Sequence, residues 1–202
     1  MVAATTRQQI VQAADTLFYE RGFEATSFAD IAVVVGLSRG NFYYHFKTKD
    51  EILHAVIAYR LSNIQAMLEA WEVGAKTPID RIRSFIQILI LNQAKIMAYG
   101  CPVGTLCNEL AKRDHIAKNR AVELFTLFRD WLSCQFTALG HGTQADELAM
   151  HILMRSQGVA ALATAFRDEA FIRREVDDIC LWLAVQRPNL SDNPESVSIQ
   201  NS

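Results

Sequence analysis

The segment Thr26–Lys49 constrains the fold most, because it contains two short helical patterns joined by a glycine. The first opens with Ser27-x-x-Asp30, a capping box in which the hydroxyl accepts a backbone N–H and the acid reaches back to the helix start. Gly36 then supplies a turn, since glycine readily adopts the left-handed conformation. Ser27 and Lys49, at the starts of two helices, are placed to contact phosphates. Two short helices in this order are typical of a helix-turn-helix that reads DNA.

The second short helix, predicted over Arg39–Phe46, separates into two faces. Phe42 and Phe46 are four residues apart and therefore share one face, which we expect to be buried. Gly40 lies on the other face, where the missing side chain would let the backbone approach DNA closely. From Gly36 to the end of the segment there are three basic residues and no acidic one, which is the local charge that a groove-inserted helix needs.

Four side chains of this helix have the chemistry for DNA contacts. Arg39 can bind O6 and N7 of guanine, and Asn41 can pair with adenine. The hydroxyls of Tyr43 and Tyr44 suit phosphates, and large exposed aromatic rings are unfavourable unless a partner covers them. The alternative is that the two helices merely pack together. The aromatic pair beside a purely basic stretch favours DNA reading.

The rest of the chain is predicted to be helical, since apolar residues recur with the helical period and nothing alternates convincingly with period two. The further predicted helices are Arg7–Arg21, Lys49–Val73, Ile79–Ala98, Val103–Arg113, Ile116–Leu139, Ala145–Phe166 and Glu169–Val185. This is an all-α fold of about nine helices. It comprises a three-helix helix-turn-helix DNA-binding domain (1–48), a larger helical domain for ligand binding and dimerisation (49–186) and a polar, disordered tail (187–202).

Composition excludes several other classes of protein. Half of the residues are hydrophobic, so a sizeable core can form, and the net charge is −2. Four cysteines without a secretory signal favour free thiols in a reducing cytoplasm, and no apolar run approaches the roughly 18 residues of a membrane span. The sequence has no Ser/His/Asp arrangement, phosphate-binding glycine loop or metal-ligand spacing. We therefore expect a cytoplasmic protein that is no enzyme, binds no membrane and holds no cofactor or metal.

A long composite pattern closely resembles the DNA-binding head of the TetR family of bacterial transcription regulators. It consists of RGF at Arg21–Phe23, T-S-x-x-D-I-A at Thr26–Ala32 and G-L-S-x-G-x-F-Y-x-H-F-x-x-K at Gly36–Lys49. The resemblance covers about the first fifty residues; beyond them the chain matches in length, helix count and apolar character. It implies a dimer whose subunits each carry a three-helix head and a larger body with a small-molecule pocket, many members being repressors released by their ligand. The positions that commonly touch DNA are Ser27, Arg39, Gly40, Asn41, Tyr43, Tyr44, His45 and Lys49.

A dimer surface is predicted on the helices Ala145–Phe166 and Glu169–Val185, because the stretch Gly158–Ala163 is rich in small residues that let helices approach closely. The candidate interface residues form one apolar stripe: Leu148, Ile152, Val159, Leu162 and Phe166. The alternative is a core helix within one subunit. A two-fold dimer predicts a pseudo-palindromic operator with half-sites roughly 34–36 Å apart, or a multiple of that spacing.

The candidate pocket consists of aromatic or soft side chains on the body helices, together with one cysteine. These residues are Phe85, Leu89, Met97, Tyr99, Cys101, Phe125, Phe128, Trp131 and Met154. Simple core packing is the alternative for each of them. A pocket of this kind would be largely apolar with a few polar anchors. The candidate anchors are Arg129, His151, Arg155 and Gln157.

Cys101 lies between Gly100 and Pro102 at the start of a predicted helix. The helix dipole lowers the pKa of a thiol there, which makes Cys101 a candidate sensor of oxidants or electrophiles. A small buried hydrophobic residue is the alternative. A disulfide with Cys107 is not expected, because six residues along a helix rise about 9 Å, beyond the roughly 7 Å between Cα atoms that a disulfide spans.

A DNA-reading head on a large apolar body favours a ligand-responsive transcriptional regulator. The simplest form is a repressor that an unknown small-molecule effector releases from double-stranded operator DNA. The long helix that begins at Lys49 would link the two parts. Thiol sensing through Cys101, and DNA binding without ligand control, are the two alternatives.

Overall fold

The computed structural model describes residues 4–186, and every regular element in that range is helical, which confirms the all-α prediction. The helices are α1 (Thr6–Arg21), α2 (Phe28–Val35), α3 (Arg39–His45), α4 (Lys49–Gly74), α5 (Pro78–Leu91), α6 (Gln93–Tyr99), α7 (Pro102–Lys112), α8 (Lys118–Ala138), the 3-10 turn η1 (Gly142–Gln144), α9 (Ala145–Phe166) and α10 (Glu169–Val185). The tail predicted over 187–202 lies outside the described residues. Between residues 4 and 186, no helix is long and apolar enough to cross a membrane.

The first four helices each begin at a hydroxyl side chain that accepts a backbone N–H three residues on, which satisfies one of the free donors at the helix start. These residues are Thr5, Ser27, Ser38 and Thr48. The capping box predicted at Ser27 is present, because Asp30 reaches back to the backbone N–H of Ser27. Gly36 has φ 71° and ψ 30°, the left-handed conformation predicted for the turn between α2 and α3.

A small aromatic core holds α1, α2 and α3 together, and we call these three helices the head. Phe42 and Phe46 are each 1% exposed, as predicted for the inner face of α3. The ring of Phe28 meets that of Phe42 edge-on at 5.2 Å between centroids, and Phe18 and Phe23 make a similar contact. These rings fix the orientation of α3 on the head and leave its opposite face to solvent.

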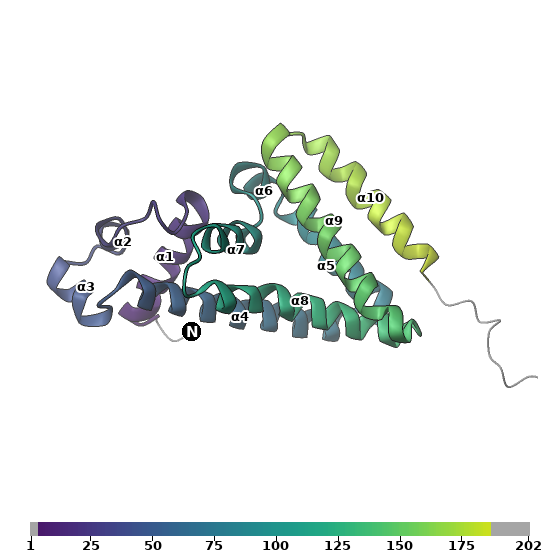
Figure 1. Ribbon diagram of the computed structural model, residues 1–202, viewed down its shortest axis with the longest axis horizontal. Coiled ribbons are helices and arrows are strands. Elements are labelled where there is room, and N and C mark those ends of the chain that lie inside the picture. The colour runs from purple at the N-terminus through teal and green to yellow at the C-terminus, as the bar shows by residue number, and fades with distance from the viewer. Residues whose placement is uncertain (1–3, 187–202) are drawn as a thin grey trace, which may run out of the picture.

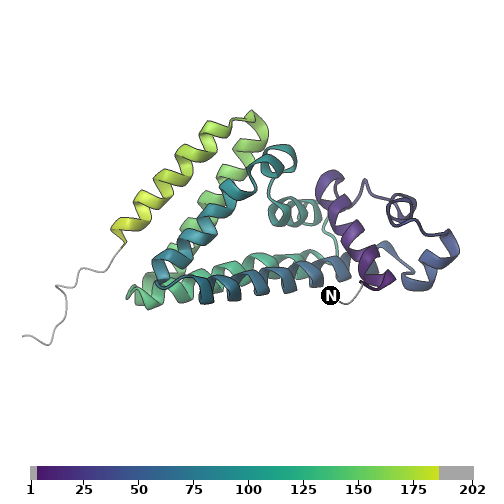
Figure 2. The ribbon, with the colours of Figure 1, turned by 180° about the vertical axis from the view of Figure 1, so that it is seen from behind.

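The helices α4 to α10 form the body, which is roughly triangular (Figures 1 and 2). The long helices α4 and α8 lie side by side along one edge, and α5, α9 and α10 form the opposite side. The helix α4 continues directly from the head, while α7 fills the corner between α1 and α8. The head therefore contacts the body both along α4 and at the corner formed by α6 and α7.

The prediction of one continuous helix over Ile79–Ala98 is wrong, since Asn92 separates α5 from α6. Asn92 has φ −110° and ψ 14°, and its side-chain amide donates to the carbonyl of Ile88 at 3.2 Å. Asparagine side chains compete in this way with the helical backbone for hydrogen bonds. No glycine or proline marks the break, so the apolar periodicity of the sequence runs across it.

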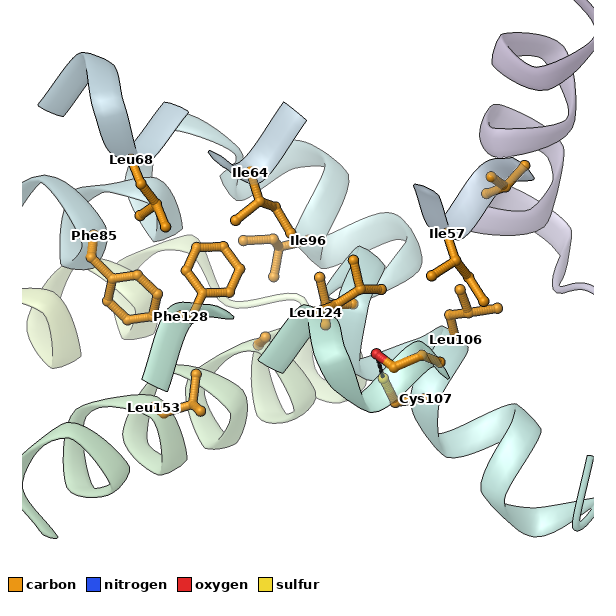
Figure 3. Packing of buried hydrophobic residues seen from close by; sticks show 14 of the residues in the cluster. Ile57, Ile64, Leu68, Phe85, Ile96, Leu106, Cys107, Leu124, Phe128 and Leu153 are labelled. Atoms are coloured by element: carbon orange, nitrogen blue, oxygen red, sulfur yellow. Dashed lines mark hydrogen bonds between the residues drawn. The ribbon is translucent and has the colours of Figure 1, made fainter. Parts of the chain in front are cut away.

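The interior of the body is lined by large apolar side chains from several helices. Figure 3 shows Ile64, Phe85, Ile96, Phe128 and Leu153 directed toward one another from α4, α5, α6, α8 and α9. The rings of Phe85 and Phe128 meet edge-on at 5.3 Å between centroids. These residues are distant in the sequence, so only the packing of the helices brings them together.

Candidate DNA-reading surface and body cavity

The outer face of α3 presents the side chains that the sequence predicts for DNA reading. Arg39, Gly40 and Asn41 are exposed at the N-terminal end of the helix, and the side chain of Tyr44 is 79% exposed. Phe42, on the opposite side of α3, is buried in the core of the head, so the polar side of the helix faces solvent. A short helix with a buried aromatic face and an exposed polar and aromatic face has the form of a recognition helix.

Two further predicted residues of α3 are half-buried. The ring of Tyr43 lies 5.3 Å from that of Phe28, and the guanidinium of Arg39 lies 5.8 Å from the centroid of the Tyr43 ring. His45 packs edge-on against Tyr44 with centroids 5.2 Å apart. These contacts orient Arg39 and Tyr44, so Tyr43 and His45 support the exposed surface as well as bordering it.

The sequence places Ser27 and Lys49 as phosphate contacts, but in the structure both are engaged within the head. The hydroxyl of Ser27 donates to the carboxylate of Asp30 at 2.5 Å, and this bond holds the pKa of that carboxyl below its usual range. The ammonium of Lys49 donates to the carbonyls of Phe23 at 3.1 Å and Glu24 at 3.2 Å. Lys49 therefore joins α4 to the loop after α1 instead of facing outward beside Arg39.

A cavity of about 350 Å³ lies inside the body. Its walls come mainly from α4 to α9, with a contribution from α1. Five of the predicted pocket residues line it: Phe85, Leu89, Cys101, Phe125 and Phe128. The volume lies within the range of about 300–1,000 Å³ typical of small-molecule sites, and the lining is predominantly apolar, as such sites usually are.

The other four predicted pocket residues do not line this cavity. Met97 and Tyr99 lie on α6 but turn away from it, and Met154 is 60% exposed over a shallower groove between α8 and α9. Trp131 lies further along α8, where its indole N–H donates to the carboxylate of Glu72 at 3.0 Å. Helical periodicity gives the facing of a residue about its own helix, but not which neighbouring helix lies opposite.

The polar residues of the cavity differ from those that the sequence suggests. Of the four candidate anchors, only Gln157 lines the cavity, whereas Arg129 and Arg155 form ion pairs with Asp146 and Glu175 elsewhere. His151 instead stacks on Trp182 with ring centroids 4.4 Å apart. The exposed residues Asn92 and Lys95 border the cavity on the α5–α6 side.

Two cavity residues, Asp15 and Tyr19, come from α1 in the head, and sequence reasoning misses both. The hydroxyl of Tyr19 donates to the carbonyl of Gly100 at 2.7 Å, and burial raises the pKa of Tyr19 to about 12, so it remains a donor. Asp15 accepts from the guanidinium of Arg60 at 2.5 Å. Asp15 and Tyr19 are polar residues of an amphipathic helix, where polar side chains normally face solvent. The pattern of α1 therefore does not indicate that the body packs against them.

Cys101 also lines the cavity, beside α9. Its sulfur accepts from the backbone N–H of Gly104 and from the side-chain amide of Gln157, each at 3.4 Å. Cys107 is buried, its thiol donates to the carbonyl of Ala121, and burial raises its pKa to about 11 (Figure 3). Cys107 is therefore a protonated packing residue, and the two thiols are free.

The five residues predicted as one dimer stripe lie on one side of α9, but that side is not a free surface along its whole length, so the prediction is wrong for part of the stripe. Ile152 and Val159 are buried in the core of their own subunit, and Leu148 is half-buried. Leu162 and Phe166 are exposed, the latter by 74%. The stripe fails because most of this side of α9 packs within its own subunit, and only its C-terminal end is exposed.

Comparison with known proteins agrees with this architecture. The family of bacterial regulatory proteins of the tetR type matches residues 10–56, and the C-terminal domain of LmrA/YxaF-like transcriptional regulators matches residues 78–177. Among solved structures, a TetR transcriptional regulator from Legionella pneumophila superposes with a TM-score of 0.77 at 25% identity, covering 89% of this chain and 99% of that one. A TetR-family regulator from Cytophaga hutchinsonii has a TM-score of 0.80 at 16% identity, covering 94% and 100%.

Sequence relatives lead to the same family. An uncharacterised HTH-type transcriptional regulator from the lacX 3′ region of Lactococcus lactis is 29% identical over 136 residues, which are 66% of this chain and 69% of the relative. The HTH-type regulator TtgR of Pseudomonas putida is 46% identical over 55 residues, 27% of this chain and 26% of its own length. This chain thus spans about a quarter of TtgR. With a matching head, a matching C-terminal domain and the same fold, the chain belongs to the TetR family of DNA-binding transcriptional regulators and is not an enzyme.

Proposed function

We propose that this protein is a ligand-controlled repressor, which leaves its operator when a small molecule binds in the body cavity. The observation that carries the proposal is the cavity of about 350 Å³ inside the body. Well-packed interiors leave few voids larger than a water molecule. A hollow of this size, lined by residues of α1 as well as of the body, is suited to a ligand whose binding changes the position of the head.

The lining indicates an uncharged, mostly apolar ligand. Only two residues that are charged at neutral pH border the cavity: Asp15, which is paired with Arg60, and Lys95, which is exposed. A charged ligand would lose its hydration without gaining a buried partner of opposite charge, which is strongly unfavourable. An aromatic or aliphatic molecule with a hydrogen-bonding group matches the walls instead.

The DNA-reading residues in this proposal lie on α3: Arg39, Gly40, Asn41, Tyr43, Tyr44 and His45. Ser27 and Lys49 would contact phosphates only after releasing their present partners.

For the dimer, we propose the exposed apolar side of α9 and α10, which extends the predicted pair Leu162 and Phe166. Further exposed apolar residues, on α10, are Leu181 and Val185. Exposed apolar patches of this kind mark contact surfaces. The protein would act in the cytoplasm, where bacterial DNA lies.

The test begins with the DNA. Selection from a random duplex library should enrich a pseudo-palindrome with two half-sites, as expected for a two-fold dimer. A panel of uncharged aromatic and aliphatic compounds is then titrated against the complex of protein and selected duplex, with prodan, an uncharged fluorescent naphthyl ketone, as the first member. Release of DNA by a compound that also binds the protein supports the proposal. A complex that no cavity-binding compound weakens would refute ligand control, and a library without enrichment would refute specific DNA reading.

Thiol sensing is a second candidate, because the sulfur of Cys101 faces the same cavity and accepts two N–H donors. An electrophile small enough to enter the cavity would therefore meet this thiol, which is the one cysteine in the lining. Cys101→Ser should abolish DNA release by the uncharged electrophile N-ethylmaleimide, whereas Cys134→Ser, at an exposed cysteine outside the cavity, should not. Equal release from both variants would eliminate this route.

A further inference from the structure

We infer that the ligand acts on a polar clasp between head and body, and that it does so through a hydrogen-bond acceptor on an otherwise apolar molecule. The clasp consists of Asp15 and Tyr19 of α1, Arg60 of α4, and the segment Gly100–Pro102 between α6 and α7. The inference rests on the proposed ligand control and specifies the chemistry of the ligand and the joint on which it acts.

The contacts of the clasp converge on one short segment. Tyr19 donates its hydroxyl proton to the carbonyl of Gly100 at 2.7 Å. Arg60 donates from Nε to the Asp15 carboxylate at 2.5 Å and from its terminal nitrogen to the carbonyl of Pro102 at 2.5 Å. Both residues of α1 are therefore held to Gly100–Pro102, one directly and the other through Arg60. A second polar contact lies nearby, where the Glu109 carboxylate of α7 accepts from the backbone N–H groups of Phe23 and Glu24 at 2.9 and 2.8 Å. The clasp is therefore one of the polar contacts that hold the head on the body, and it is the one that borders the cavity.

The cavity reaches the clasp without an intervening layer. Asp15 and Tyr19 line it, and so do Cys101 and Pro102 of the segment that they hold. A molecule in the cavity therefore touches both sides of the joint between head and body. The remaining wall around Phe85, Leu89 and Phe128 is apolar, so a polar group on the ligand finds its partners at the clasp.

Tyr19 decides which polar group that is, because it lines the cavity and its hydroxyl is a donor. A carbonyl or ether oxygen on the ligand can accept from this hydroxyl, and the bond that it takes no longer joins α1 to the carbonyl of Gly100. Arg60 lies behind the lining: it is only 7% exposed, and among residues 4–186 it is the one charged side chain that is buried. A buried guanidinium needs acceptors, so Asp15 can leave Arg60 only if another acceptor replaces its carboxylate.

The experiment uses prodan, whose ketone is an acceptor, and dimethylaminonaphthalene, which has the same ring system without the ketone. Fluorescence gives the affinity of each probe for the full chain, and titration of the selected duplex gives the DNA affinity with and without each probe. Tyr19→Phe removes the bond to Gly100 but keeps the ring that packs edge-on against Tyr99. Asp15→Asn changes the other arm, and Tyr59→Phe, on α4 outside the cavity, is the matched control.

We expect prodan to weaken DNA binding of the wild type by about five-fold or more, the usual lower range of allosteric coupling. The ketone-free analogue should bind but release little DNA. In Tyr19→Phe the ligand-free DNA affinity should fall about five-fold, the value of one ordinary hydrogen bond, and prodan should then have a correspondingly smaller effect. Tyr59→Phe should behave as the wild type. Thermal melting checks that each variant is folded. If Asp15→Asn does not fold, Tyr19→Phe alone tests the clasp.

Wild-type DNA affinity and wild-type prodan response in both Tyr19→Phe and Asp15→Asn would overturn the clasp. Equal DNA release by prodan and its ketone-free analogue would overturn the role of the acceptor. Failure of ligand control itself has a different signature: the whole compound panel leaves the wild-type complex intact, while Tyr19→Phe alone still weakens it. That result would support the clasp as the joint that sets DNA affinity.

Discussion

The head and the body are built from similar residues but packed in different ways. In the head, the rings of Phe18, Phe23, Phe28, Phe42 and Phe46 fill the space between three short helices. In the body, Phe85 and Phe128 border a cavity of about 350 Å³. Apolar content alone therefore does not produce a filled core. The three short helices of the head close around a few large rings, whereas the long helices of the body leave a hollow where they diverge.

Helix capping is uniform in the head and mixed in the body. All three helices of the head begin at a hydroxyl side chain that binds a free backbone N–H. In the body, α4, α5, α7 and α10 also begin at a side chain that accepts a backbone N–H, whereas α6, α8 and α9 do not. The three uncapped helices all contribute to the walls of the cavity. The starts of the head helices are therefore determined by neighbouring residues, and those of α6, α8 and α9 depend on packing.

The largest expected effect concerns the packing of the head. Phe42→Ala removes the ring beneath α3 and should lower the free energy of unfolding of the head by about 3–5 kcal/mol. Tyr44→Ala, at a 79% exposed position two residues on, should stay within about 0.5 kcal/mol of the wild type yet lose DNA binding. Urea denaturation followed by circular dichroism measures both. Similar losses of stability in the two variants would mean that the two faces of α3 are not distinct.

Adding volume should sharpen the contrast between filled and hollow cores. Ala14 is fully buried in α1, and Ala160 is buried in α9 at the cavity wall. Ala14→Leu should destabilise the protein by about 1–3 kcal/mol through overpacking. Ala160→Leu can grow into the cavity and should be neutral or raise stability by about 0.5–2 kcal/mol, while it weakens binding of prodan. The same loss of stability in Ala14→Leu and Ala160→Leu, measured by thermal melting, would contradict the difference between a filled head and a hollow body.

The smallest effect tests the difference in capping. Ser27→Ala removes the hydroxyl that caps α2 and should cost about 1 kcal/mol. Gln144→Ala, at the start of α9, removes a side chain that makes no capping bond and should change stability by less than about 0.5 kcal/mol. The two midpoints of thermal unfolding give the answer directly. A loss at Gln144 as large as that at Ser27 would show that the caps do not distinguish α2 from α9.

Much of the fold could be predicted because its signals are local. The capping box at Ser27, the turn at Gly36 and the buried pair Phe42 and Phe46 depend on residues within a few positions of one another, and the structure confirms them. The break at Asn92 could not be predicted, because a side-chain amide and not a glycine or proline redirects the chain there. The outward-facing Arg39 was within reach of the sequence, but the inward turn of Lys49 was not, since its partners lie in the loop after α1.

The helical fold, the starts of most helices and the exposed face of α3 can all be inferred from the sequence, because each depends on side chains close together in the chain. The cavity in the body depends instead on how distant helices pack. Phe85 and Phe128 line the cavity while Met97 and Trp131 do not, and Tyr19 meets Gly100, which lies 81 positions further along the chain. The physical reason is that a helical pattern fixes the facing of a residue about its own axis, whereas a cavity depends on which helices cross and how closely they pack.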